Sequence, residues 1–91
     1  MPRHRTTVSI VMPIFNGERF LRSSLVSLLA QTFQDFEIIC VNDGSTDSSE
    51  SIITEYAERD SRVKIVNQAN GGVASARNAG IENAEGRYLL F

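Results

Sequence analysis

The chain has 91 residues, 42% of them apolar, and a formal net charge of -2. This length suits a single globular domain, and the scattered charges exclude the basic patch that binds nucleic acid or an anionic membrane surface. The single cysteine, Cys40, cannot form an intramolecular disulfide. No segment approaches the roughly 18 apolar residues of a membrane span. We therefore expect a cytoplasmic domain, with membrane association of the intact protein left open.

The first half of the chain alternates between buried-strand and amphipathic-helix patterns. Residues 8–14, "VSIVMPI", are rich in branched apolar side chains, which predicts a strand buried on both faces. Residues 36–42, "FEIICVN", repeat that strand pattern. Between them, residues 17–31 predict an amphipathic helix, because four leucines recur at helical spacing: Leu21, Leu25, Leu28 and Leu29.

The second half of the chain continues the same alternation. Residues 45–60 predict a second helix, in which Asp47 and Glu50 have the spacing of a capping box. Gly86 has the position of a helix stop. The other expected elements are a strand at 62–67, a helix at 73–85 and a fourth, buried strand at 87–91.

The order βαβαβαβ predicts an α/β fold, which is Rossmann-like with a mainly parallel sheet and helices on both faces. We expect residues 1–7 to form a mobile N-terminal tail and residues 8–91 to form one domain. Ligands of open parallel sheets bind beyond the carboxyl ends of the strands. The candidate sites are therefore the three strand exits, "PIFNGE", "VNDGSTD" and "NQANGG".

The second strand exit carries an acidic residue of interest. Asp43 directly follows the predicted strand, where an ionised carboxylate can accept a hydrogen bond from a ring N–H such as that of uracil. An Asp before a Gly is equally typical of a turn, so these rules alone leave the two readings even. For Asp47 we favour the helix cap over a ligand contact.

The first strand exit offers weaker candidates. Phe15 can stack against a base and Asn16 can cap the first helix, although ordinary structural roles are favoured for both. Glu18 lies in the first turn of that helix, where the helix dipole favours a carboxylate whatever its function.

The third strand exit leads into the glycine-rich segment "NGGVASARN". It lacks the spacing of the dinucleotide-binding and Walker motifs, so neither a dinucleotide-binding fold nor a P-loop ATPase is supported. Arg77, one turn inside the predicted helix, can hold a diphosphate or pair with a carboxylate such as Asp43. Both readings stay open.

Taken together, the motifs "P-x-F-N-x-E", "Q-T-F-x-D-F-E", "N-D-G-S-T-D" and "G-x-x-x-A-R-N-x-G" occur in one order along the chain. This combination resembles the amino-terminal, nucleotide-binding half of the catalytic domain of family two glycosyltransferases, which have the GT-A fold. The resemblance covers nearly the whole chain beyond its first few residues. It implies a partial GT-A domain that is truncated at the fourth strand.

The resemblance also implies roles for individual residues. Pro13, Ile14 and Phe15 would line the base pocket, with Phe15 in place of the family's more usual tyrosine. Asp43 would accept a hydrogen bond from the uracil ring, and Asn42 stands where the family often has a second aspartate. The candidate nucleotide-binding residues are Pro13, Ile14, Phe15, Asn16, Glu18, Asp43 and Arg77.

Enzymes of this family transfer a sugar from a nucleotide diphosphate donor to an acceptor hydroxyl with inversion. The resemblance implies a UDP-sugar donor, an unknown glycan or lipid acceptor, and Mg or Mn held by an aspartate motif. That motif and the carboxylate base are expected beyond Phe91, so we expect no catalytic or metal-binding residue within the chain. The intact protein would be an enzyme and this fragment alone would be inactive.

An alternative from another class is a catalytically silent α/β module that binds no ligand and associates with itself. A partial domain should leave one sheet edge and some apolar helix surface uncovered. A homodimer formed through that surface is therefore a second expectation.

Overall fold

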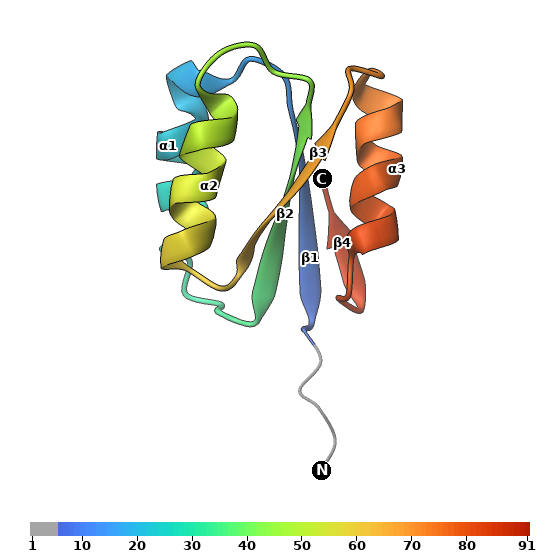
Figure 1. Ribbon diagram of the computed structural model, residues 1–91. Coiled ribbons are helices and arrows are strands. Elements are labelled where there is room, and N and C mark those ends of the chain that lie inside the picture. Colours follow the sequence, from blue (N-terminus) through green and yellow to red (C-terminus); the bar gives the residue numbers. More distant parts are fainter. Residues whose placement is uncertain (1–5) are drawn as a thin grey trace.

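The structure is a computed structural model that describes residues 6–91, a four-stranded parallel sheet with helices on both faces (Figure 1). Most of the predicted tail, residues 1–5, lies outside the described residues. Thr7 belongs to the fold, because its carbonyl accepts a hydrogen bond from the Tyr88 amide at 2.9 Å. In chain order the elements are β1 (Val8–Ile14), α1 (Glu18–Leu29), β2 (Phe36–Asp43), α2 (Ser49–Arg59), β3 (Val63–Gln68), α3 (Val73–Asn83) and β4 (Tyr88–Leu90).

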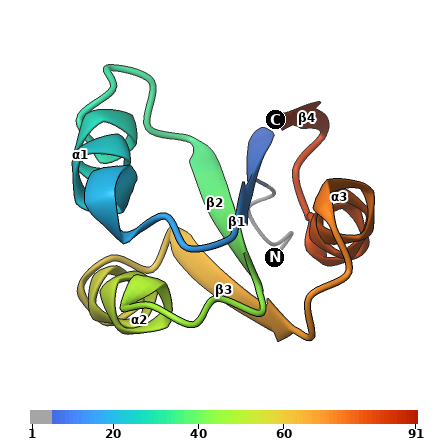
Figure 2. The same cartoon turned by 90° about the horizontal axis from the view of Figure 1, so that it is seen from above.

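The predicted α/β fold is confirmed, and the strands lie in the order β3-β2-β1-β4. Figure 2 shows α1 and α2 against one face of the sheet and α3 against the other. The chain therefore leaves β1 towards one face and leaves β3 towards the opposite face. Such a change of face marks the place where open α/β sheets bind ligands, beyond the carboxyl ends of the strands.

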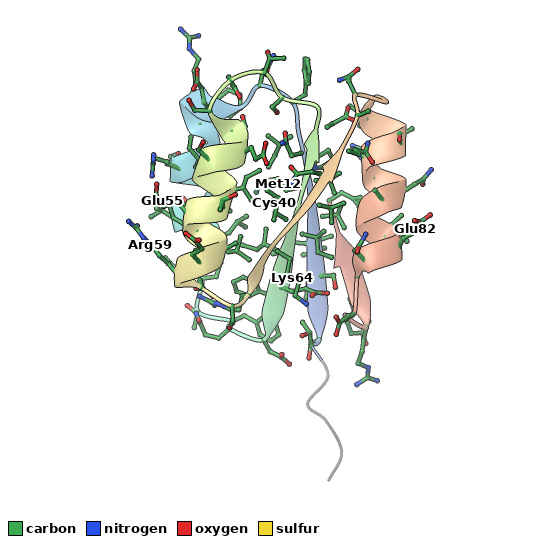
Figure 3. All side chains as sticks on the ribbon, in the orientation of Figure 1. Met12, Cys40, Glu55, Arg59, Lys64 and Glu82 are labelled. Atoms are coloured by element: carbon green, nitrogen blue, oxygen red, sulfur yellow. The ribbon has the colours of Figure 1, made fainter. Side chains whose placement is uncertain are left out.

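Strand β2 is buried along its whole length, because each of its faces meets a helical layer. Cys40 and Met12 face α1 and α2, and Figure 3 shows both between the sheet and these helices. The opposite face of β1 and β2 packs against α3 through a smaller cluster: Val11, Ile39, Val41 and Ala76. Successive β2 residues therefore serve two separate cores, as the two-residue period of a strand requires.

Helix α3 packs directly against β1 at Gly80. A Cβ atom added at Gly80 would lie 2.2 Å from Cγ1 of Val11. The buried residues of α3 are Ala76 and Gly80, so the helix meets the sheet through small residues.

Two expectations for the end of the chain are wrong. Gly86 does not cap α3, which ends at Asn83 with Ala84 as its C-cap residue. Instead, a Cβ at Gly86 would lie 2.6 Å from the Ser9 amide nitrogen, so this glycine permits close approach to β1. The fourth strand is exposed rather than buried, because it pairs only with β1 and forms the edge of the sheet.

Candidate functional site

The carboxyl ends of β1, β2 and β3 lie at one end of the sheet, at the top of Figure 1. All but one of the predicted nucleotide-binding residues lie at this end, either where β1 and β2 end or just beyond β1: Pro13, Ile14, Phe15, Asn16, Glu18 and Asp43. Arg77 lies within α3. The parallel register brings the strand exits side by side, since Ile14 pairs with Asn42 and Asp43 pairs with Gln68.

Asp43, at the end of β2, is only 4% exposed and its carboxylate accepts four hydrogen bonds. Oδ1 accepts from Nε2 of Gln68 and from the Gly71 amide, each at 2.8 Å. Oδ2 accepts from the Gly72 amide at 3.0 Å and from Nδ2 of Asn70 at 3.3 Å. Asp43 therefore fixes the loop that joins β3 to α3, a structural role that differs from the local turn considered from the sequence.

The charge of Asp43 is held by neutral donors alone. Hydrogen bonds from the Gln68 side chain and from the Gly71 and Gly72 amides lower the pKa of Asp43 despite its burial. None of the ion pairs between residues 6–91 involves Asp43. This end of the sheet thus presents an ionised carboxylate with no counter-charge of its own.

Arg77 does not pair with Asp43, which was one of its two predicted roles. Its guanidinium lies over the ring of Phe91, with Cζ 5.7 Å from the ring centroid, and the residue is exposed. The cation is thereby placed beside the end of β4, and its role towards phosphate stays a prediction.

Pro13, Ile14 and Phe15 line one pocket at the end of β1. It has a volume of about 280 Å³ and is completed by α1 and the loop before it, through Gly17, Phe20, Leu21 and Ser24, with Met12 at its base. Phe15 is 55% exposed and its ring is free to stack. Neither Asp43 nor Arg77 lines this pocket, so the structure gathers the three β1 residues without these two.

The side chains of Asn16 and Glu18 contact the loop between β2 and α2. Oδ1 of Asn16 accepts a hydrogen bond from the Thr46 amide at 2.8 Å, and Oε2 of Glu18 accepts one from the Ser48 amide at 3.1 Å. The predicted cap of α1 by Asn16 is wrong, because Gly17 is the N-cap residue and no side chain caps there.

The predicted capping box of α2 is also wrong in detail. The N-cap residue is Ser48, without a side-chain cap bond, rather than Asp47. Asp47 still serves the helix terminus, because its Oδ1 accepts a hydrogen bond from the Ser49 amide at 2.9 Å. Hydrogen bonding from Ser49 is the main cause that lowers the pKa of Asp47.

Sequence reasoning did not assign the donors around Asp43. Gln68, Asn70 and the two glycines lie in "NQANGG", which was noted only as a polar exit. The signal that could have found them is the parallel register, because neighbouring strand ends must place Gln68 next to Asp43.

Two further findings bear on function. Within residues 6–91, no group of three or more His, Cys, Asp or Glu side chains could hold a metal ion. Over the same range, no helix has the length and apolar character needed to cross a membrane.

Comparison with known proteins identifies relatives of the chain. It is 51% identical over 84 residues to the uncharacterized glycosyltransferase EpsJ of Bacillus subtilis. The aligned region spans 92% of the chain and 24% of EpsJ. It is 42% identical over 84 residues to the glycosyltransferase GlyA of Streptococcus pneumoniae, again over 92% of the chain but only 12% of GlyA. The chain therefore spans a quarter or less of these curated relatives.

Solved structures show the same fold. The structure of S. aureus TarS residues 1–349 superposes with a TM-score of 0.86 at 32% identity, over 93% of the chain and 26% of TarS. The complex of the same protein with UDP gives a TM-score of 0.85. A mannosyltransferase of Pyrobaculum calidifontis, solved with GDP-Man and Mn2+, shares the fold with a TM-score of 0.73 at 22% identity, over 89% of the chain and 25% of that protein.

The family described as glycosyl transferase family 2 matches residues 9–91, nearly the whole chain. This match agrees with the relatives and with the GT-A fold of the TarS structures. The chain belongs to glycosyl transferase family 2.

Proposed function

We propose that this chain is the nucleotide-sugar-binding half of an inverting glycosyltransferase, and that its donor is a UDP-sugar. The observation that carries the proposal is the likeness to TarS, which has been solved with UDP and superposes over 93% of the chain. The acceptor would be a glycan or lipid hydroxyl.

The arrangement of the candidate site supports a bound nucleotide. An exposed aromatic ring at Phe15 suits stacking on a base, and the ionised Asp43 suits a ring N–H donor. Arg77 supplies an exposed cation for phosphate. A carboxylate offers about four acceptor positions, and all four are used in Asp43. We therefore expect the uracil N–H to replace the longest of its bonds, from Nδ2 of Asn70 at 3.3 Å.

The Mg or Mn ion implied by the family does not fit the residues described. Residues 6–91 contain no group of three or more metal-binding side chains, and the Asp43 oxygens already accept N–H donors. We propose that the ion and the carboxylate base belong to parts of the intact enzyme outside this chain. The chain alone would then bind the donor without transferring its sugar.

Titration of the chain with UDP, followed by amide NMR, tests the nucleotide site. We expect shifts at Phe15, Asp43 and Gly71, and about tenfold weaker binding in Asp43→Asn, because bonds to charged groups are among the stronger ones. Glu82→Gln is the matched control, since Glu82 lies on the outer surface of α3 (Figure 3). An Asp43→Asn variant that binds UDP as the unaltered chain does would reject the role of this carboxylate.

A second titration tests the phosphate role of Arg77. We expect Arg77→Met to weaken UDP and to leave uridine unaffected, because only UDP carries the diphosphate. Equal losses for both ligands would assign Arg77 to the nucleoside instead. The absence of any shift at millimolar UDP would reject the nucleotide site as a whole.

The exposed apolar surface favours a second candidate function, self-association without a ligand. The last four residues of the chain, 88–91, are all 41% to 62% exposed, and the first three of them form the edge strand β4. Such an edge can pair with another chain. Sedimentation across a wide concentration range decides this: a stable dimer supports the candidate, and a monomer throughout rejects it.

A further inference from the structure

The loop after β1 and the loop after β2 are joined by five hydrogen bonds between a backbone amide of one and a side chain of the other. They link Asn16 N to Ser45 Oγ (3.0 Å), Gly17 N to Ser49 Oγ (2.9 Å), Glu18 N to Asp47 Oδ2 (3.2 Å), Thr46 N to Asn16 Oδ1 (2.8 Å) and Ser48 N to Glu18 Oε2 (3.1 Å). Five backbone amides are therefore satisfied by side chains from across this contact.

Glu18 and Asp47 make this contact reciprocal. Asp47 accepts from the Glu18 amide, while Glu18 accepts from the Ser48 amide, next to Asp47. Both carboxylates lie at helix N-termini, where backbone amides lack helical partners and negative charge is favoured. Each carboxylate thus serves the start of the neighbouring helix, and we call this arrangement the cross-cap of Glu18 and Asp47.

Ser49, next to the cross-cap, takes part in two hydrogen bonds at this contact. It is fully buried, and its hydroxyl accepts from the Gly17 amide. The same residue donates its backbone amide to Asp47 at 2.9 Å. Ser49 therefore contacts both loops, and its burial gives the contact a fixed position within the fold.

The loops joined in this way lie next to two of the candidate nucleotide-binding residues, Phe15 and Asp43. Phe15 directly precedes Asn16 in the first loop, and Asp43 ends the strand that leads into the second. Asn16 itself has a φ of 51°, in the left-handed region that most residues avoid, and its bonds to Ser45 and Thr46 hold it there. These contacts hold the loop that begins at Phe15 against the loop that follows Asp43.

We propose that Glu18, Asp47 and Ser49 are positioning residues, which hold Phe15 and Asp43 at the separation that a nucleotide requires. Glu18 then acts through the second loop and not as a direct ligand of the nucleotide, because its carboxylate is engaged with the Ser48 amide. This inference rests on the proposed nucleotide site; it gives Glu18 an indirect role and adds Asp47 and Ser49.

Three variants and one control test the inference by UDP titration. Ser49→Ala removes the acceptor of Gly17 N, and Glu18→Ala removes that of Ser48 N; we expect about fivefold weaker UDP binding in each, the effect of one lost hydrogen bond. Glu18→Gln keeps a carbonyl oxygen for Ser48 and should recover most of the affinity. Ser51→Ala, an exposed serine of the same helix as Ser49, is the matched control.

Two results would overturn the inference. One is UDP binding in Ser49→Ala and Glu18→Ala that equals binding in Ser51→Ala. The other is a Glu18→Gln variant as weak as Glu18→Ala, because a direct ligand that needs its charge is not replaced by an amide.

Amide hydrogen exchange without ligand separates this inference from the proposed function. In the unaltered chain, the amides of Gly17, Glu18 and Ser48 should be protected, and Ser49→Ala should release Gly17 first. Exchange of all three at the rate of an unfolded chain would reject the cross-cap even if UDP binds. A protected cross-cap in a chain that binds no UDP would instead reject the nucleotide site and the positioning role that depends on it.

Discussion

Strand β2 buries one carboxylate at each end of the same face, and the two are satisfied in different ways. Asp43, at the carboxyl end, accepts from the Gly71 and Gly72 amides, just before α3. Glu37, at the amino end and only 2% exposed, accepts from the Glu85 amide, just after α3. The two carboxylates therefore hold the two connections of one helix.

The two carboxylates differ in that Glu37 has a cationic partner and Asp43 has none within residues 6–91. Oε1 of Glu37 lies 2.8 Å from Nζ of Lys64, which Figure 3 shows on the lower half of the sheet, while Asp43 has no ion pair within residues 6–91. Burial tends to raise the pKa of Glu37, but bonds from Lys64, Ser9 and Glu85 outweigh it and lower that pKa. The charge of Glu37 is therefore balanced by a cation within the fold, whereas the charge of Asp43 is balanced by hydrogen-bond donors.

Removal of the cation should have the largest effect on stability. Lys64→Met leaves Glu37 buried without its counter-charge, and breaking a fully buried pair costs about 3–5 kcal/mol. Because the Lys64 side chain is 42% exposed, water replaces part of the interaction, and we expect a loss of about 2 kcal/mol in urea unfolding. Lys64→Arg should keep most of the stability. A Lys64→Met protein as stable as the unaltered one would remove the distinction between the two carboxylates.

A substitution within α3 that displaces the helix from the sheet should weaken the connections at both ends of the helix. Gly80→Ala places a methyl group against Val11, and we expect a loss of about 1–2 kcal/mol in the free energy of unfolding. Asn78→Ala, at an exposed position of the same helix, should change it little. Faster amide exchange at both Gly71 and Glu85 in Gly80→Ala would show that the position of α3 controls the connections at both of its ends. Faster exchange at only one of these amides would contradict that.

Acid should reduce the contribution of both Asp43 and Glu37 to the free energy of unfolding. Their pKa values in the folded protein lie below the ordinary 3.8 of Asp and 4.5 of Glu, so their contribution is present above those values and is lost as the pH falls through the folded values. The free energy of unfolding should therefore fall below about pH 4. Asp43→Asn should flatten this dependence, and the Gly71 and Gly72 amide signals should move with Asp43; signals that stay fixed would contradict the four-donor arrangement.

The smallest effect is expected at Ser75. Its hydroxyl lies 3.4 Å from Nε2 of Gln68, a long contact compared with the 2.8 Å bond from Gln68 to Asp43. Ser75→Ala should therefore change the free energy of unfolding by less than about 0.5 kcal/mol and leave UDP titration unchanged. A larger loss would place Ser75 among the groups that hold Asp43.

The order and type of the elements could be predicted because each depends on local patterns of apolar residues. The strand patterns of residues 8–14 and 36–42, and the leucine spacing of the helix between them, can be read without knowledge of the rest of the chain. The cap positions failed because Asn16 and Asp47 bond to partners about 30 residues away in sequence, which no local rule contains.

The buried cluster of Glu37 escaped prediction for a related reason. A single acid within "FEIICVN" reads as a minor interruption of an apolar strand. Its partners lie on two other strands, Ser9 directly opposite on β1 and Lys64 on β3. Only the sheet order and register place a hydroxyl and a cation on either side of it.

The sparse pairing of β4 has a consequence for the order of folding. Three residue pairs join it to β1, and they connect the beginning of the chain with its end, so the chain must close its longest loop to gain its smallest ladder. The other two strand pairs, β1 with β2 and β2 with β3, join segments that lie closer in sequence. We expect β4 to dock last and to detach first, so the edge of β1 becomes accessible for short intervals while the rest of the sheet stays intact.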